Sequence, residues 1–235
     1  QYGNGVYNST DGGKTWSNKG LQKTHHIGKV IIHPENPNVV YVAAQGQYYT
    51  DNEERGVYKT TNSGNSWKKV LSIKHGKIHV GVTDLVMDPR DSNVLYATSY
   101  QRIRRPWGFS GAGPKSGIYK TVDGGKNWKK LSGGLPSGLL GKIGLAIFPR
   151  NPDILYAIIE DANSPEMSYE ERWIEIQNGK PSTKPTVGNI VYRTDDAGLI
   201  WRQASEGNVG GRPNYYGQII VDPNDDKVIY VLSEK

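Results

Sequence analysis

The chain has 235 residues, a formal net charge of +6, 29 Gly, 15 Tyr and no Cys. Without Cys it has no disulfide framework, and no stretch approaches the roughly 18 consecutive apolar residues of a membrane helix. Basic and acidic residues are interspersed, which gives little support for nucleic-acid binding. Abundant Gly and Tyr favour strands joined by tight turns. The chain starts at Gln1 rather than Met, which we interpret as a processed, cloned or fragmentary start.

One eight-residue motif, here called the box, recurs four times and predicts a repeat architecture. Its pattern is Ser/Thr-x-Asp-x-Gly-x-x-Trp, and the copies are 9–16 (STDGGKTW), 60–67 (TTNSGNSW), 121–128 (TVDGGKNW) and 194–201 (TDDAGLIW). Asn62 replaces Asp in the second copy. A short β-prone run precedes each copy, at 5–7, 56–58, 117–119 and 190–192.

Two further apolar runs recur around each copy. The first ends at a Pro, at 30–34, 85–89, 145–149 and 219–223, and the second follows a short turn, at 39–42, 94–97, 154–157 and 228–231. Each unit therefore has four predicted strands, A (ending at the Pro), B, C (before the box) and D (from the box Trp), with tight A–B and C–D hairpins. Strands A and B are almost continuously apolar, so both of their faces must be covered. These features predict an all-β fold, a β-propeller of four-stranded antiparallel blades.

The repeat also predicts how the chain divides. Strands C and D of a partial blade occupy 1–20, full blades occupy 21–72, 73–132 and 133–205, and strands A and B of another partial blade occupy 206–235. Either the two partial blades combine into one, or the chain is an interior segment of a larger propeller. We favour the segment, because four blades is the lower end of the known range.

The boxes themselves have a mechanical interpretation. The Asp carboxylate accepts backbone N–H groups inside the C–D turn, the Gly adopts a positive φ, and the Trp packs a large ring on the sheet. Four equivalent copies argue against a catalytic or metal-binding role, since function is grafted onto a repeat rather than carried by it. The predicted structural residues are Asp11, Trp16, Asn62, Trp67, Asp123, Trp128, Asp196 and Trp201.

The boxes resemble those of the bacterial BNR/Asp-box repeat proteins, which include sialidases, xyloglucanase-type glycosidases and sortilin-like propellers. The resemblance covers essentially the whole chain and is nearest to large exported sortilin-like, glycosyl hydrolase-like repeat proteins. It is carried further by 24–28 (THHIG), 52–58 (NEERGVY), 104–107 (RRPW) and 133–138 (GGLPSG). The resemblance implies the fold and export, so the expected location is secreted, periplasmic or at a bacterial cell surface.

Loop lengths indicate where a site is to be expected. The spacing between box tryptophans grows from 51 to 61 to 73 residues, and nearly all the growth falls between strands B and C, at 45–55, 99–116 and 160–188. Variable loops on a rigid scaffold concentrate binding and catalysis. We therefore expect function on the face that carries the B–C loops, here called the B–C face, opposite the boxes. A short helical insertion within 167–184 is a candidate for partner docking or a solvated excursion.

Several residue types on this face suit ligand binding. Three arginines beside an aromatic ring are suited to carboxylate, phosphate or sugar recognition, although such clusters are as often structural. The candidate binding residues are His25, His26, Arg102, Arg104, Arg105, Trp107, Tyr215 and Tyr216. No motif has metal-ligand spacing, so no metal and no cofactor is predicted.

The candidate catalytic residues are Glu160, Asp161 and Asp84, with solvated loop acids as the favoured alternative. A glycosidase pair would need two carboxyl groups roughly 5–10 Å apart, which a sequence does not give. Sialidase activity is disfavoured, because the chain lacks the Arg-Ile-Pro signature that those enzymes usually show near their start. Residues 102–104 (RIR) match it only in part and in the wrong context.

The favoured functional hypothesis is an exported binding scaffold for a protein or a glycan. Its expected partners are the remaining blades or domains of the parent chain and a polypeptide or glycan ligand, with no nucleic acid and no membrane span. The alternative is part of a glycoside hydrolase, xyloglucanase-like or sialidase-like, that acts on a polysaccharide. A purely structural spacer is a third and weaker hypothesis.

Overall fold

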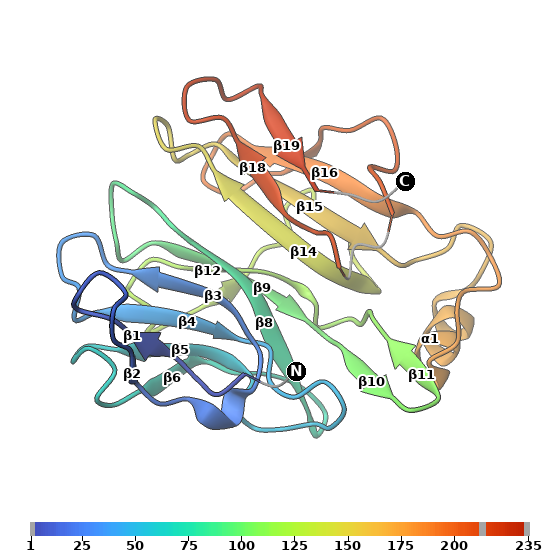
Figure 1. Cartoon of the computed structure of the whole chain (residues 1–235). Coiled ribbons are helices and arrows are strands. Elements are labelled where there is room, and N and C mark those ends of the chain that lie inside the picture. The colour runs from blue at the N-terminus through green and yellow to red at the C-terminus, as the bar shows by residue number, and fades with distance from the viewer. Residues whose placement is uncertain (1–2, 212–214, 233–235) are drawn as a thin grey trace.

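A computed structural model describes residues 3–211 and 215–232 of the protein, and nearly all of its regular structure is strand (Figure 1). The elements are β1 (Tyr7–Asn8), β2 (Ser17–Asn18), η1 (Gln22–Thr24), β3 (Ile27–Ile32), β4 (Val40–Ala44), β5 (Gly56–Thr60), β6 (Lys68–Leu71), β7 (Ile73–His75), β8 (Ile78–Met87), β9 (Leu95–Tyr100), β10 (Ile103–Arg105), β11 (Gly108–Ser110), β12 (Gly117–Thr121), β13 (Lys129–Lys130), β14 (Leu140–Ile147), β15 (Leu155–Asp161), α1 (Tyr169–Asn178), β16 (Gly188–Thr194), β17 (Arg202–Gln203), β18 (Ile219–Val221) and β19 (Ile229–Val231).

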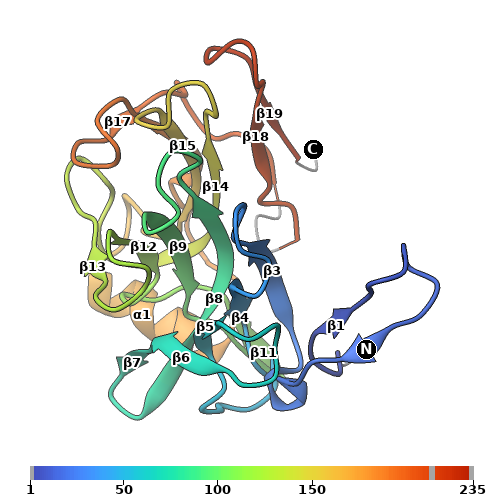
Figure 2. The ribbon, with the colours of Figure 1, turned by 90° about the vertical axis from the view of Figure 1, so that its left-hand side faces the viewer.

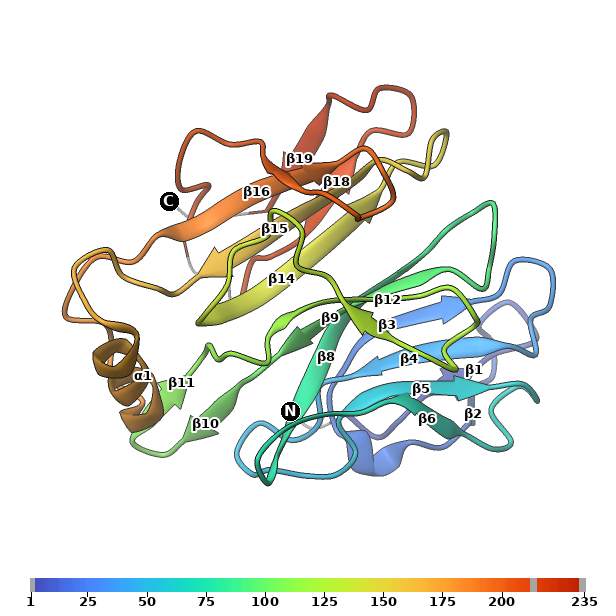
Figure 3. The same ribbon diagram turned by 180° about the vertical axis from the view of Figure 1, so that it is seen from behind.

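Three antiparallel sheets form full blades. The first blade has the order β3-β4-β5-β6, the second β8-β9-β12-β13 with β7 added beside β8, and the third β14-β15-β16-β17. The pairs β1-β2 and β18-β19 form separate two-stranded sheets at the two ends. The A strands β3, β8, β14 and β18 are neighbours in that order, so the sheets fan out from a common inner edge (Figures 2 and 3). The protein is thus a β-propeller of four-stranded antiparallel blades, as predicted.

The hydrophobic core lies between the sheets rather than within one. Tyr41, Val57, Val80 and Leu95 are fully buried where the first blade packs on the second, and Ile143 belongs to the next cluster, between the second and third blades. A third cluster joins the third blade to β18-β19. Burial of both faces explains the continuous apolar runs of the B strands β4, β9 and β15, whereas β3 leaves Val30 and Ile32 exposed.

The box turns are held as expected from their chemistry. In the third copy, the Asp123 carboxylate accepts hydrogen bonds from Asn127 N at 2.9 Å and from the Thr121 hydroxyl at 2.7 Å. Gly124 and Gly125 have φ values of +68° and +90°, which favour glycine. Asn62 accepts from Ser66 N at 2.9 Å, so an amide serves the same turn. The box therefore stabilises the turn of the C–D hairpin.

A recurrent contact joins each blade to the next. Tyr41 and Lys59 both donate to the Gly124 carbonyl oxygen at 3.0 Å, and the Lys59 ammonium lies 5.0 Å from the Tyr41 ring centroid. Tyr96 and Lys120 bind the Ala197 carbonyl in the same way, at 2.9 and 2.7 Å. We call this Tyr–Lys–carbonyl contact the blade latch. It uses the box turn of one blade to fix the angle of its neighbour.

The structure adds details that the repeat pattern did not contain. The 99–116 loop contains the hairpin β10-β11, and each D strand starts one residue after the box Trp. Trp201 is buried in the cluster between the second and third blades, whereas Trp16 is 62% exposed. Lysines on the outermost strands β6 and β13 discourage edge-to-edge pairing.

Candidate functional site

The B–C face carries the largest elaborations of the fold. The hairpin β10-β11 and the helix α1 lie side by side there, away from the box turns (Figure 1). Phe109 N donates to the Gly179 carbonyl oxygen at 3.1 Å and joins the two. Ser168 and Glu171 form a capping box at the start of α1, and Gly179 ends it with φ +69°. The insertion is thus an ordered part of this face.

Four side chains from two blades form a continuous stack on this face. The His26 and Tyr48 rings are parallel, with centroids 3.6 Å apart. The Arg102 guanidinium lies 3.7 Å from the Tyr48 centroid and 5.0 Å from that of Phe109. His26 also reaches the Gly46 carbonyl oxygen through Nδ1, at 3.0 Å. Stacking between rings holds Arg102 in one orientation.

The other arginines of this loop have different roles. Arg105 donates to the Ser110 hydroxyl at 3.0 Å and to the Gln177 carbonyl at 3.2 Å, tying the hairpin to α1. Arg104 is half-buried, and its backbone N donates to the Tyr48 carbonyl at 2.7 Å. Trp107 is 76% exposed at the hairpin tip. Of the four candidates in this loop, Trp107 is the one most open to a ligand.

A cleft of about 520 Å³ lies between this hairpin, α1 and the end of β15. Its lining includes Phe109, Glu160, Arg172, Lys180 and Tyr215, together with small apolar residues. We call it the Glu160 cleft. It brings two of the residues expected from the sequence, Glu160 and Tyr215, into one cavity.

Glu160 is held against the inner edge of the third blade. Its Oε2 accepts a hydrogen bond from Lys142 N at 3.0 Å. A Cβ on Gly141 would lie 2.0 Å from the same oxygen, so glycine permits this approach. Burial raises the pKa of Glu160 to about 7, against the opposing effects of Lys142 and Arg172. A carboxyl group that titrates near neutrality can donate or accept a proton.

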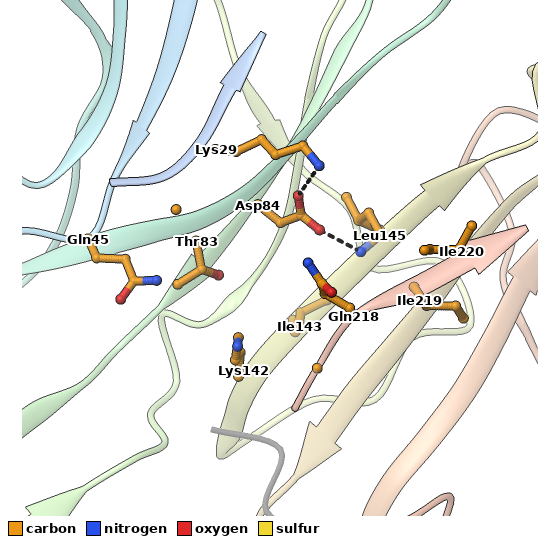
Figure 4. A pocket seen from close by; sticks show the side chains of 12 residues that line it. Lys29, Gln45, Thr83, Asp84, Lys142, Ile143, Leu145, Gln218, Ile219 and Ile220 are labelled. Carbon is orange, nitrogen blue, oxygen red and sulfur yellow. Dashed lines mark hydrogen bonds and ion pairs between the residues drawn. The ribbon is translucent and has the colours of Figure 1, made fainter. Parts of the chain in front are cut away.

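Asp84 lies in a second cavity of about 220 Å³, between the inner strands (Figure 4). Its carboxylate accepts from Leu145 N at 3.0 Å and from Leu85 N at 2.9 Å, and Lys29 Nζ is 4.0 Å away. Burial raises the pKa of Asp84, while those two backbone bonds oppose the change. Leu145 belongs to the next blade, so Asp84 bridges two blades and lies in a different cavity from Glu160.

Asp161 and the remaining candidates do not converge on Glu160. Neighbouring residues of a strand point to opposite faces, and the buried Asp161 carboxylate accepts from Asn163 N at 3.0 Å. Tyr216 is 42% exposed. His25 Nε2 contacts the Gln47 amide at 2.9 Å, and its backbone adopts φ +56°. Within 3–211 and 215–232, the Glu160 cleft is thus lined by one carboxyl group, that of Glu160.

Several residues of this face were not predicted from the sequence. Arg55 is 2% exposed and donates to the carbonyls of Gln47, Thr50, His79 and Arg102, which shapes the first B–C loop. Arg172 is buried in α1 and donates to the Ala162 carbonyl at 2.8 Å and to Glu175 at 3.0 Å. Arg172 could have been recognised from the sequence, because it is an Arg on the apolar side of the predicted helix. Arg55 had no local signal.

Two negative observations concern the described part of the chain. No group of three or more His, Asp or Glu side chains among these residues is arranged to hold a metal ion. No helix there is long and apolar enough to cross a membrane.

Fold and repeat together define an Asp-box β-propeller with elaborated loops on one face. A family model described as "Sortilin, neurotensin receptor 3" matches residues 4–138, which is more than half of the chain. The chain belongs to this Sortilin-Vps10 family.

Similar solved structures support the same fold. A GH74 xyloglucanase from Xanthomonas campestris superposes with a TM-score of 0.66 at 16% identity, covering 98% of this chain and 32% of that one. A GH74 enzyme from Niastella koreensis gives a TM-score of 0.64 at 16% identity, covering 97% and 32%. The chain therefore spans about a third of these structures.

One curated relative is similar in sequence. It is a probable oligoxyloglucan-reducing end-specific xyloglucanase of Neosartorya fischeri, 23% identical over 106 residues. The match covers 45% of this chain and 10% of that protein, so the chain spans a small part of its relative.

Proposed function

We propose that this chain is a segment of a larger exported Asp-box propeller that binds a glycan in the Glu160 cleft. The observation that carries the proposal is a single cleft of about 520 Å³ that combines a carboxyl group, a guanidinium group and two aromatic rings. Binding sites are typically concave, with apolar walls and a few converging polar groups. The proposal is favoured over a spacer, because a spacer needs no formed cleft on this face.

The lining suits a sugar. The C–H faces of a pyranose pack against rings such as Phe109 and Tyr215, while its hydroxyl groups donate to Glu160 and accept from Lys180 or Arg172. The names of the related proteins specify xyloglucan, so a β-glucan backbone is the first ligand to test. Trp107 at the nearby hairpin tip is a further platform for a longer chain.

We further propose the predicted division of the chain, with partial blades at 1–20 and 206–235 and full blades at 21–72, 73–132 and 133–205. The remaining blades of the parent propeller would then be the first partners. Export to a bacterial surface, the periplasm or the medium is part of the same proposal.

The test is binding to an array of plant and microbial glycans, followed by calorimetry on the best ligand. Tyr215→Ala and Glu160→Gln should each weaken binding about tenfold or more, since each removes a cleft contact. Tyr49→Ala is the matched control, because Tyr49 is 53% exposed on another B–C loop and outside the cleft. A ligand whose affinity falls equally with all three variants would contradict the proposal.

The second candidate is part of a glycoside hydrolase, and the specific observation that favours it is the carboxyl group of Glu160 in the cleft lining, where burial raises its pKa to about 7. That value suits a general acid, which protonates the leaving oxygen of a glycosidic bond. Asp84 and Asp161 accept backbone hydrogen bonds elsewhere, so neither is the second carboxyl group that this mechanism needs. Release of reducing sugar from xyloglucan, abolished by Glu160→Gln, would favour this function over binding alone.

A further inference from the structure

A small cavity of about 10 Å³ lies between the first and second blades, separate from the Glu160 cleft. It is lined by Gln45, Tyr48, Arg55, Thr83, Tyr100 and Arg102. A space of this size accommodates a single atom-sized or water-sized guest.

Three hydrogen-bond donors of this lining have no partner within the protein. They are the Tyr100 hydroxyl, Arg102 Nε and Arg55 Nε, and all three atoms are buried. Tyr100 itself is 4% exposed. Leaving a buried donor unpaired destabilises the folded protein, so three unpaired donors in one lining call for a guest that accepts hydrogen bonds.

Two acceptors of the same lining already take part in hydrogen bonds within the protein. Gln45 Oε1 accepts from the Tyr48 hydroxyl at 2.8 Å, and the Thr83 hydroxyl pairs with that of Thr98 at 3.1 Å. A water molecule would have to donate its two hydrogens to the remaining lone pairs of Gln45 Oε1 or of the hydroxyl oxygens, beside two positively charged guanidinium groups. A monatomic anion has no hydrogens and accepts from every donor.

The charges around the cavity also favour an anion. The guanidinium group of Arg55 lies 3.9 Å from the carboxylate of Asp51. Arg102, by contrast, forms no ion pair with any of the described residues. The Arg102 guanidinium is instead stacked between Tyr48 and Phe109, which fixes its position. Another acid, Glu160, accepts from Lys142 N and lines the neighbouring cleft rather than this cavity.

We propose that this cavity is a halide site, occupied by chloride, which accepts hydrogen bonds from Tyr100, Arg102 and Arg55. Chloride there ties the first B–C loop to the second, because Arg55 comes from one and Arg102 from the other. The site is independent of the proposed glycan binding.

The test compares the thermal unfolding midpoint of the 235-residue chain in sodium chloride, sodium bromide and sodium gluconate at equal ionic strength. A ligand of the folded state raises the midpoint saturably, and we expect a rise of about 2–4 °C in chloride and bromide over gluconate. Tyr100→Phe should abolish most of that difference, whereas Tyr49→Phe should preserve it. Equal midpoints in the three salts, or an undiminished difference in Tyr100→Phe, would overturn the proposal.

Crystals of the unmodified protein grown in bromide provide a second readout that needs no variant. An anomalous peak between Tyr100 and Arg102 is expected. A water-sized peak without anomalous signal would show that the cavity holds water, which also overturns the proposal.

Discussion

The Tyr41 hydroxyl donates a 3.0 Å hydrogen bond to the carbonyl oxygen of Gly124, which lies 83 residues further along the chain. This bond joins the B strand of one blade to the Asp-box turn of the next. The same latch recurs at Tyr96 and Ala197. The boxes therefore act both within a hairpin and between blades.

Removing the latch hydroxyl should destabilise the protein. Tyr41→Phe leaves the Gly124 carbonyl with its bond to Lys59, so we expect a loss of about 1 kcal/mol in the free energy of unfolding. Urea denaturation measures it. Tyr49→Phe, at an exposed position, should change stability by less than about 0.5 kcal/mol. Equal effects of the two substitutions would contradict the latch.

The box carboxylates should make stability depend on pH at the acid end. Hydrogen bonds to Asn127 and Thr121 lower the pKa of Asp123 to about 2, from 3.8. A depressed folded-state pKa gives stability that is present above about pH 4 and lost as the pH falls through 2. Asp123→Asn copies Asn62 and should flatten this dependence. The measurement is urea denaturation across pH 2–5, with the exposed Glu206→Gln as control.

Glu160 should give the opposite dependence at higher pH. Burial raises the pKa of Glu160 from 4.5 to about 7, so its stabilising protonated form is lost as the pH rises through 7. Glu160→Gln stays neutral and can still accept from Lys142 N. We expect the variant to match the unmodified protein near pH 4 and to be more stable by about 3 kcal/mol above pH 8. A stability difference that does not change with pH would show that this carboxyl titrates normally.

Two residues of the 99–116 loop, Arg102 and Trp107, should behave differently when substituted. Arg102→Ala removes a guanidinium stacked between two rings and should cost about 1–2 kcal/mol. Trp107→Ala, at the exposed hairpin tip, should leave stability unchanged within about 0.5 kcal/mol. Thermal unfolding of both variants measures the contrast. A large loss for Trp107→Ala would mean that its ring packs in solution.

The sequence predicted the propeller because its determinants are local. Asp-box turns, Pro-terminated A strands and continuous apolar runs each follow from short-range chemistry repeated four times. Loop growth also pointed to the face on which the Glu160 cleft lies.

The roles of individual side chains were not predictable in the same way. Asp84 was a candidate acid, but its carboxylate accepts from Leu145 N, 61 residues away. Arg102 stacks on Tyr48 from another blade. Such contacts depend on how blades pack, which no spacing within a single repeat encodes.

Binding of a glycan in the Glu160 cleft is tested most directly by the substitution Gly141→Ala. A Cβ at Gly141 would lie 2.0 Å from Glu160 Oε2, so alanine must displace the carboxyl group without removing it. Calorimetric titration with xyloglucan oligosaccharides should show binding by the unmodified protein and a loss of about tenfold or more in both Gly141→Ala and Glu160→Gln. Unchanged affinity in both variants, or no glycan bound by the unmodified protein, would contradict the account.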